Sequence, residues 1–298
     1  MGAKLSPGMR IFVTSFATIL AMVVVAGSMM LLGLFDDMIE SRLITFVVNL
    51  FVAIINISLI SYLMKKLDHV HIKEMGFRVE RKDLFFVLTA FIVTLTLILS
   101  YVGVLIHHNF ISGTFNISLL KELNFYLLFL VACIGWIFAA SHEEVLTRGY
   151  FMKNLSHRKI LSMLLISPLL FTIIHIPFRG LNPAMLLTWF FGGISYSYLY
   201  LKSGSLSVTT LVHAIHNITN DLAFYNLPNF SLFSLAENLT SHYKGYYELL
   251  LCISIIFLTF IFYGKNGFFT PAHNLSNFWE KHKNEVKVEQ VNKNSVTP

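Results

Sequence analysis

Long apolar blocks dominate this sequence and limit the folds open to it. Eight of them are long enough, or nearly long enough, to cross a lipid bilayer as helices: 11–35, 43–63, 84–106, 124–141, 160–176, 184–201, 206–226 and 247–263. Only 13% of the residues are charged, against roughly 25% in an average soluble domain. The pattern predicts an all-α polytopic membrane protein of about eight transmembrane helices and excludes one large water-soluble core.

Basic residues lie mostly in the connections between these blocks, where they indicate orientation. They are frequent in 65–82, in 148–159 and after 263, whereas 36–42 is acidic and 107–123 has only Lys121. We therefore expect both termini in the cytoplasm and block 11–35 to be an uncleaved first span. No basic, aromatic-interleaved patch lies outside these connections, so the net charge of +6 does not indicate a nucleic-acid partner.

The chain is expected to form one transmembrane domain over 1–263, followed by a polar tail. The tail, 264–298, lacks helical periodicity, and we expect it to be mobile in the cytoplasm. The polar residues of interest lie within about 120–225, which predicts an intramembrane active-site cavity formed by this part of the domain.

The fourth block leads into two adjacent acidic residues, Glu143 and Glu144. If the helix continues to about Leu155, Arg148 lies one turn after Glu144 and can neutralise it. Glu143 then points about 100° away without such a partner. An unneutralised carboxylate in apolar surroundings is a plausible general base. The alternative is an ordinary helix end with its charges at the water interface.

Histidines mark the fifth and seventh blocks. Phe171 and His175 are one turn apart in the fifth, and His213 and Asn217 share a helix face in the seventh. A neutral imidazole and a carboxamide are suitable hydrogen-bond donors to a developing oxyanion. Each also fits ordinary hydrogen bonding between membrane helices. His216 lies off this face, and we assign it a structural role.

Together these residues form an ordered set on three blocks: Glu-Glu-x3-Arg, Phe-x3-His and His-x3-Asn. The set resembles the CPBP family of intramembrane proteases, which includes the CaaX prenyl endopeptidases and bacterial proteins linked to bacteriocin maturation or self-immunity. The resemblance covers roughly 120–225 and extends to Gly192-Gly193 and Lys202-Ser203-Gly204-Ser205-Leu206. The matching motif residues are Glu143, Glu144, Arg148, Phe171, His175, His213 and Asn217.

The resemblance implies that Glu143 and His175 hold and activate a water molecule, with Glu143 as general base. It also implies that His213 and Asn217 stabilise the oxyanion of the tetrahedral intermediate. The implied substrate is a membrane-embedded or lipidated peptide or protein, in the bilayer of a cell membrane, which we expect to be a bacterial plasma membrane. No serine or cysteine stands out as an activated nucleophile, which favours water. We assign supporting roles to Glu144, Arg148 and Phe171.

Two questions remain open from the sequence. Glu143, His175 and His213 could together hold zinc, although no His-Glu-x2-His motif is present, and we favour metal-independent chemistry with no cofactor. The chain could also be a catalytically idle scaffold or self-immunity factor of the same family. A transporter that relays protons through intramembrane His and Glu is a third interpretation.

Helix geometry tests whether the candidate residues reach one depth. Counted from the lysines and serine expected at the cytoplasmic face, Glu143, His213 and Asn217 lie ~15, ~12 and ~18 Å into the bilayer. His175 comes out at ~24 Å, which is too deep. A kink at Pro168, a tilt of the helix, or a dip of the 154–159 connection into the bilayer would close the gap.

Overall fold

The computed structural model describes residues 5–34, 41–225, 227, 229–235 and 240–281, without the side chains of 179 and 240–242. These residues are almost entirely helical. The α-helices are α1 (Pro7–Leu31), α3 (Arg42–Leu63), α4 (Arg81–His107), α5 (Leu123–Glu144), α6 (Met152–Asn154), α7 (Ile160–Arg179), α8 (Pro183–Ser203), α9 (Leu206–Phe224) and α10 (Thr240–Tyr263). The strands β1 (Gly113–Phe115) and β2 (Phe233–Leu235) form one antiparallel pair between two connections.

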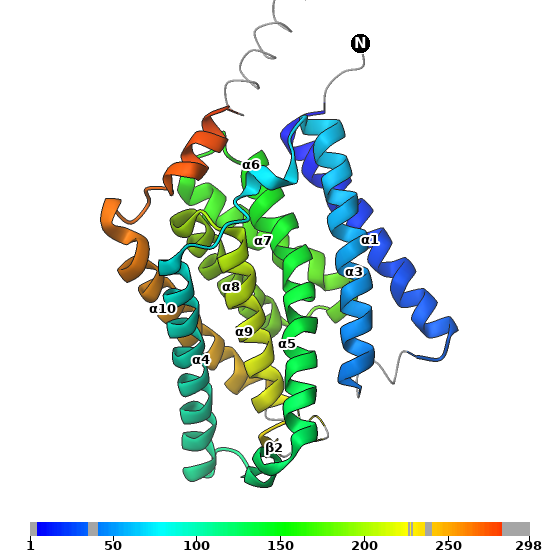
Figure 1. Ribbon diagram of the computed structural model, residues 1–298, viewed down its shortest axis with the longest axis vertical. Helices are drawn as coiled ribbons and strands as arrows, with labels where there is room; N and C mark the ends of the chain where they lie inside the picture. Colours follow the sequence, from blue (N-terminus) through cyan, green and yellow to red (C-terminus); the bar gives the residue numbers. More distant parts are fainter. Residues whose placement is uncertain (1–4, 35–40, 226, 228, 236–239, 282–298) are drawn as a thin grey trace, which may run out of the picture.

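The long helices form a bundle with α8 and α9 in its interior (Figure 1). Helix α9 packs against α4 and α5, and α8 packs against α7 and α10. On the other side of α5 lies α3, and α1 packs mainly against α3. The bundle therefore surrounds the two helices that carry Gly193 and His213 with apolar neighbours.

Among the described residues, six helices are long and apolar enough to cross a membrane: α1, α3, α4, α5 with its continuation, α7 and α10. Helices α8 and α9 are more polar, because they contain tyrosine, serine, threonine, histidine and asparagine at positions that are mostly buried. Interior helices need not be as apolar as lipid-facing ones, since protein contacts satisfy their polar groups. The chain is a multi-pass membrane protein, as the sequence predicted.

Local sequence signals fix several helix starts. Ser6, Ser41 and Ser205 each accept a hydrogen bond from the backbone N–H three residues later, at the starts of α1, α3 and α9. Asn182 caps α8, with Pro183 in its first position. These caps satisfy N–H groups that a helix start leaves unpaired.

The turn between α8 and α9 explains the Lys202-Ser203-Gly204-Ser205-Leu206 motif. Gly204 ends α8 with a left-handed backbone (φ 65°), and a side chain there would clash with Asn274 and Ala272. Ser205 then starts α9. The motif therefore encodes a tight turn between the two central helices.

The chain after α10 packs against the bundle for about twenty residues, which the sequence did not predict. Residues 273–281 are helical, and the side chains of Leu275 and Trp279 are buried in an apolar cluster. Lys202 donates to the carbonyl oxygens of Gly267 and Thr270 at 2.6 and 2.7 Å. The expectation of a mobile tail therefore does not hold for residues 264–281, whose aromatic and apolar side chains pack on the bundle, and the rest of that tail lies outside the described residues.

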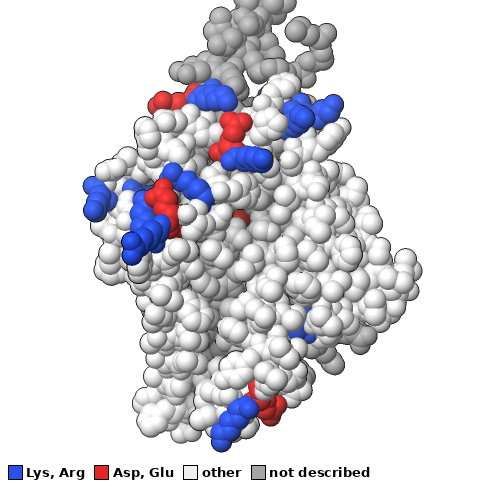
Figure 2. Space-filling model, in the orientation of Figure 1, with Lys and Arg blue, Asp and Glu red and all other residues white. Residues whose placement is uncertain are grey.

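Charged side chains are distributed unevenly over the surface. Figure 2 shows most of those on this face gathered at the upper end of the bundle, above a broad uncharged band. The strand pair lies at the opposite, lower end (Figure 1). This distribution suits a bilayer around the uncharged band, and the cytoplasmic placement of the upper end stays a prediction from the basic connections.

Candidate active site

Glu143, near the end of α5, lies between two imidazole rings from different helices. Its Oε1 atom is 3.9 Å from Nε2 of His175, and its Oε2 atom is 3.7 Å from Nε2 of His213. Both separations are too long for direct hydrogen bonds. A water molecule at ordinary hydrogen-bond distance can contact both atoms of either pair. The structure thus brings together three of the four predicted catalytic residues.

His175 is held on α7 by its own helix and by aromatic neighbours. Its Nδ1 atom lies 2.7 Å from the carbonyl oxygen of Phe171, which can only accept a hydrogen bond. Nδ1 therefore carries the proton, and in the neutral ring Nε2 faces Glu143 as an acceptor. The ring packs edge-to-face against Phe171 and stacks on Trp189 at 5.0 Å. The Phe-x3-His spacing thus orients the histidine.

His213, on α9, is held by the second acidic residue. Its Nδ1 atom lies 2.8 Å from Oε1 of Glu144, and the same carboxylate oxygen accepts from Nη1 of Arg148 at 3.0 Å. The predicted pair of Glu144 and Arg148 is therefore confirmed, and it has a second function that the sequence did not reveal. A neutral imidazole that donates from Nδ1 has no proton on Nε2, so the expectation of a neutral donor at that atom needs revision.

Arg148 is completely buried and connects the three motifs. It donates to Oγ1 of Thr147 at 2.7 Å and to the carbonyl oxygen of Gly193 at 3.0 Å. Its guanidinium also lies over the rings of Phe171 and Tyr196, at 4.7 and 5.4 Å from their centroids. These contacts desolvate a charge that Glu144 compensates. They explain why the motifs contain an aromatic residue at Phe171 and a second glycine in Gly192-Gly193.

The helix that carries the two acidic residues continues beyond α5, as predicted. Residues Val145–Phe151 form a π-helical segment, and α6 extends the helix to Asn154. Ser167 of α7 donates to the carbonyl oxygen of Thr147 at 2.8 Å, which ties the π segment to the neighbouring helix. Wide turns of this kind are frequent at functional sites. Here the segment buries Arg148 one turn after Glu144.

The depth estimate placed Glu143 too near the surface, because Lys153, the residue from which its depth was counted, is buried. Lys153 is only 3% exposed, and its Nζ atom lies 2.5 Å from Oδ1 of Asp68. Asn154 and Ser156 are buried as well. The chain from Lys153 to Ser156 is thus tucked into the protein, whereas residues 157–159 are exposed. Glu143 therefore lies deeper than the estimate, and its Oε1 atom is 3.9 Å from Nε2 of His175, so the two residues lie side by side.

Asn217 lies one helical turn after His213 on α9 and is partly buried. Its carboxamide makes no hydrogen bond to any residue that the structure describes. Within the same described ranges, no group of three or more His, Cys, Asp and Glu side chains is arranged to hold a metal ion. The membership of Asn217 in the site stays a prediction from its helical spacing to His213, and the binding of zinc stays a matter for experiment.

Three buried polar residues near the site escaped sequence analysis. Tyr196 of α8 stacks on the ring of His213 at 4.6 Å. Glu248 of α10 pairs with His216, and Asp221 of α9 binds Arg42 at 2.7 Å. The acidic residues could have been found, since each lies in an apolar block, where ionisable side chains are costly. Tyr196 carries no such signal.

Comparison with known families adds to this geometry. Residues 123–219 match the Rce1-like family, which is described as type II CAAX prenyl endopeptidase Rce1-like. This segment is a CPBP family domain. It begins at the first residue of α5 and runs to within five residues of the end of α9, so it contains every residue of the three motifs. Searches among curated proteins and among solved structures gave no match.

The Rce1-like domain covers about a third of the chain, and the remaining helices surround it. The match of this domain to an endopeptidase family suggests a protease, and the long apolar helices of the described residues suit a membrane. The family resemblance inferred from the motifs is therefore confirmed. The residues that perform the reaction, and the substrate, are addressed below.

Proposed function

We propose that the protein is an intramembrane endopeptidase that hydrolyses a peptide bond of a prenylated, CaaX-type protein or peptide. The observation that carries this proposal is the position of Glu143 between the two Nε2 atoms, at 3.9 and 3.7 Å. A carboxylate in that position can accept a proton from water while a neighbouring imidazole orients the same molecule. The substrate class comes from the family name, and the protein's membrane helices suit a lipid-modified substrate.

The reaction uses the site as follows. A water molecule donates one hydrogen bond to Glu143 and one to Nε2 of His175, which is an acceptor because Nδ1 donates to Phe171. Its oxygen attacks the scissile carbonyl carbon while its proton passes to Glu143. The oxyanion that forms accepts hydrogen bonds from Asn217 and from His213. Glu143 then protonates the leaving nitrogen as the C–N bond breaks.

The contact between His213 and Glu144 sets a condition on this scheme. Donation from Nε2 to the oxyanion requires the doubly protonated ring, because Nδ1 already donates to Glu144. Glu144 lies 2.8 Å away and is placed to stabilise such an imidazolium. Its own charge is balanced by Arg148.

The test compares two peptides of one sequence ending in a CaaX motif, one farnesylated on the cysteine and one not, with purified protein in proteoliposomes. We expect cleavage of the farnesylated peptide, and a loss of cleavage rate of about 10²–10⁴-fold in Glu143→Gln. Glu74→Gln, an acidic residue at the surface outside the site, is the matched control and should retain full activity. The proposal fails if wild-type protein cleaves neither peptide, or if Glu143→Gln cleaves at the wild-type rate. Cleavage of both peptides would show an endopeptidase that does not need the prenyl group.

A further inference from the structure

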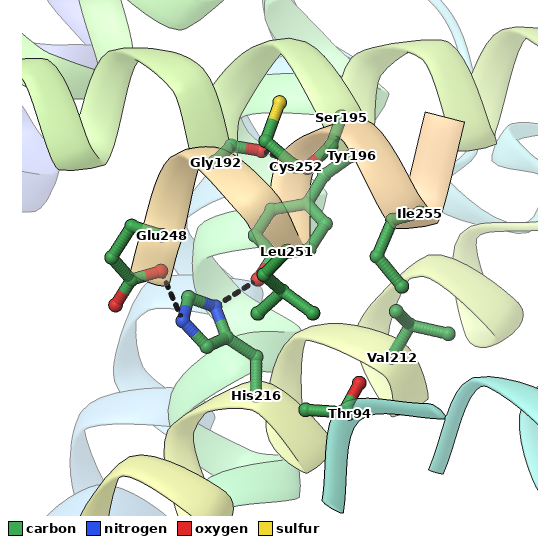
Figure 3. Close-up of a pocket in the computed structure, with 10 residues that line it drawn as sticks. All are labelled: Thr94, Gly192, Ser195, Tyr196, Val212, His216, Glu248, Leu251, Cys252 and Ile255. Carbon is green, nitrogen blue, oxygen red and sulfur yellow. Dashed lines mark hydrogen bonds and ion pairs between the residues drawn. The ribbon is translucent and has the colours of Figure 1, made fainter. Parts of the chain in front are cut away.

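A second group of buried polar residues lies beside the candidate site and comes from three helices. His216 of α9 lies between Glu248 of α10 and Tyr196 of α8 (Figure 3). Nε2 of His216 is 2.6 Å from Oε2 of Glu248, and the Tyr196 hydroxyl makes a short hydrogen bond with Nδ1. Asn220 donates to the other oxygen of Glu248 at 3.1 Å. The group borders a cavity of about 10 Å³, the size of one water molecule.

Glu248, His216 and Tyr196 form a chain of polar contacts, and their chemistry indicates where each proton lies. The carboxylate of Glu248, 2.6 Å from Nε2 of His216, favours a proton on that nitrogen, because a carboxylate has no proton of its own to share. In the neutral ring Nδ1 is then an acceptor, and it receives the hydroxyl proton of Tyr196. Glu248 thereby selects the tautomer of His216, and His216 fixes the hydroxyl of Tyr196.

Tyr196 connects this chain to the candidate site. Its ring stacks on His213 with the planes 22° apart and the centroids at 4.6 Å. Glu144 holds one edge of the His213 ring, and Tyr196 covers one face. The position of the tyrosine ring therefore sets the plane of the imidazole and, with it, the direction of Nε2.

A contribution to stability alone is a poor explanation for this chain of buried polar contacts. Glu248 is 3% exposed, within a helix long and apolar enough to cross a membrane. Ionisable groups in that setting are costly and usually mark function, and a buried ion pair is often no more stabilising than apolar side chains of the same volume. Catalytic geometry, in contrast, depends on how neighbouring residues hold a reacting group.

We propose that Glu248, His216 and Tyr196 are positioning residues that hold the His213 imidazole in the orientation needed for the oxyanion. This inference rests on the proposed function. The three residues do not touch the reacting atoms, and they act through the ring plane of His213. A small misorientation of such a group lowers the rate of the chemical step while leaving substrate binding intact.

The experiment is a double-mutant cycle on kcat and KM with the farnesylated CaaX peptide. Tyr196→Phe keeps the stacked ring and removes its hydroxyl, and Glu248→Gln removes the charge at the other end of the chain. We expect each to lower kcat about tenfold with KM within about twofold of wild type. The double variant should be no slower than either single one, because both break one chain. Tyr263→Phe, which removes a hydroxyl bound to Asp83 at 2.8 Å, is the matched control and should leave kcat unchanged.

The possible outcomes separate the two proposals. If Glu143→Gln abolishes cleavage but Tyr196→Phe and Glu248→Gln keep the wild-type kcat, the positioning role is wrong and the proposed function stands. Losses that multiply to about a hundredfold in the double variant would also overturn it, as would a change confined to KM. If wild-type protein cleaves neither peptide, the proposed function fails and takes this inference with it. Should Glu248→Gln not fold, as judged by its elution profile and thermal unfolding, His216→Gln replaces it in the cycle.

Discussion

Oε1 of Glu144 lies 2.8 Å from Nδ1 of His213. Because the same atom also accepts from Arg148, one carboxylate oxygen holds an imidazole and a guanidinium that are far apart in the sequence. The two adjacent acidic residues of the motif therefore differ in their surroundings. Glu144 is fully buried and paired, whereas the side chain of Glu143 is 22% exposed and faces two histidines. This difference separates a structural carboxylate from a reactive one.

The stability of variants should reflect that difference. Removing one partner of a buried ion pair leaves an uncompensated charge, so Glu144→Gln should lower the free energy of unfolding by about 3–5 kcal/mol. Glu143→Gln should change it by less than about 1 kcal/mol, although we expect it to lower activity by about 10²–10⁴-fold. Denaturant unfolding of both variants in detergent micelles measures the contrast. Equal destabilisation by the two substitutions would contradict the division of roles.

The two glycines of α8 offer a matched pair of substitutions. A Cβ atom on Gly193 would lie 2.8 Å from Cβ of Pro168, on α7, and the Gly193 carbonyl accepts from Arg148. A Cβ atom on Gly192 would lie 3.9 Å from its nearest neighbour, Cε2 of Tyr196. We expect Gly193→Ala to destabilise the protein by about 1–3 kcal/mol through overpacking.

Gly192→Ala is the control and should be neutral or slightly stabilising, because alanine is the better helix former. The measurement is thermal unfolding together with cleavage of the farnesylated peptide. Since the clash would push α7 away from α8, Gly193→Ala should lower activity as well. If the two variants behave alike, Gly193 does not lie as close to Pro168 as described, and the packing of α7 on α8 leaves room for a methyl group.

Much of this architecture was predictable, because apolar blocks and motif spacing report local, periodic properties. The long helices and the pair of Glu144 and Arg148 followed from helical geometry. Contacts between helices could not be derived in that way. The bond from Glu144 to His213, the stacking of Tyr196 and the burial of Lys153 all depend on how separate helices pack. The disagreement between the depths estimated for Glu143 and His175 had the same origin, since Lys153, from which Glu143 was counted, was taken to lie at the surface.

Asp68 forms the centre of a second buried charge cluster, at the end of the bundle where α6 lies. Its Oδ1 atom is 2.9 Å from Nη1 of Arg10 and 2.5 Å from Nζ of Lys153, so it links α1 to the continuation of α5. Asp68→Asn would leave two buried cations without their carboxylate, and we expect a loss of about 3–5 kcal/mol.

An exposed ion pair provides the comparison for Asp68. Glu74 and Lys281 are 3.2 Å apart, but the lysine side chain is 60% exposed, so Glu74→Gln should cost less than about 1 kcal/mol. Thermal unfolding at low and at high salt measures both variants. The effect of Asp68→Asn should be nearly independent of salt, because buried charges are weakly screened. A small or strongly salt-dependent loss would show that the cluster is open to water.

Removal of metal ions by a chelator tests whether the proposed cleavage depends on zinc. The two oxygens of Glu143 face different histidines, an arrangement that suits a general base with an oriented water molecule. We expect cleavage to persist after incubation with a strong zinc chelator, and elemental analysis to find less than one zinc per chain. Loss of activity that returns on addition of zinc would instead assign Glu143, His175 and His213 as metal ligands.

Asn217 provides the most direct test of oxyanion stabilisation. Its carboxamide has no hydrogen bond to the described residues, so Asn217→Ala should leave thermal unfolding unchanged. A lost oxyanion donor typically lowers kcat about 10²–10³-fold, with little effect on KM because the contact forms in the transition state. Thr219→Ala, two residues further along α9, removes a hydroxyl that bonds its own helix, and it should keep the wild-type kcat. An Asn217→Ala variant that raises KM and keeps kcat would mean that this residue binds the substrate instead of the oxyanion.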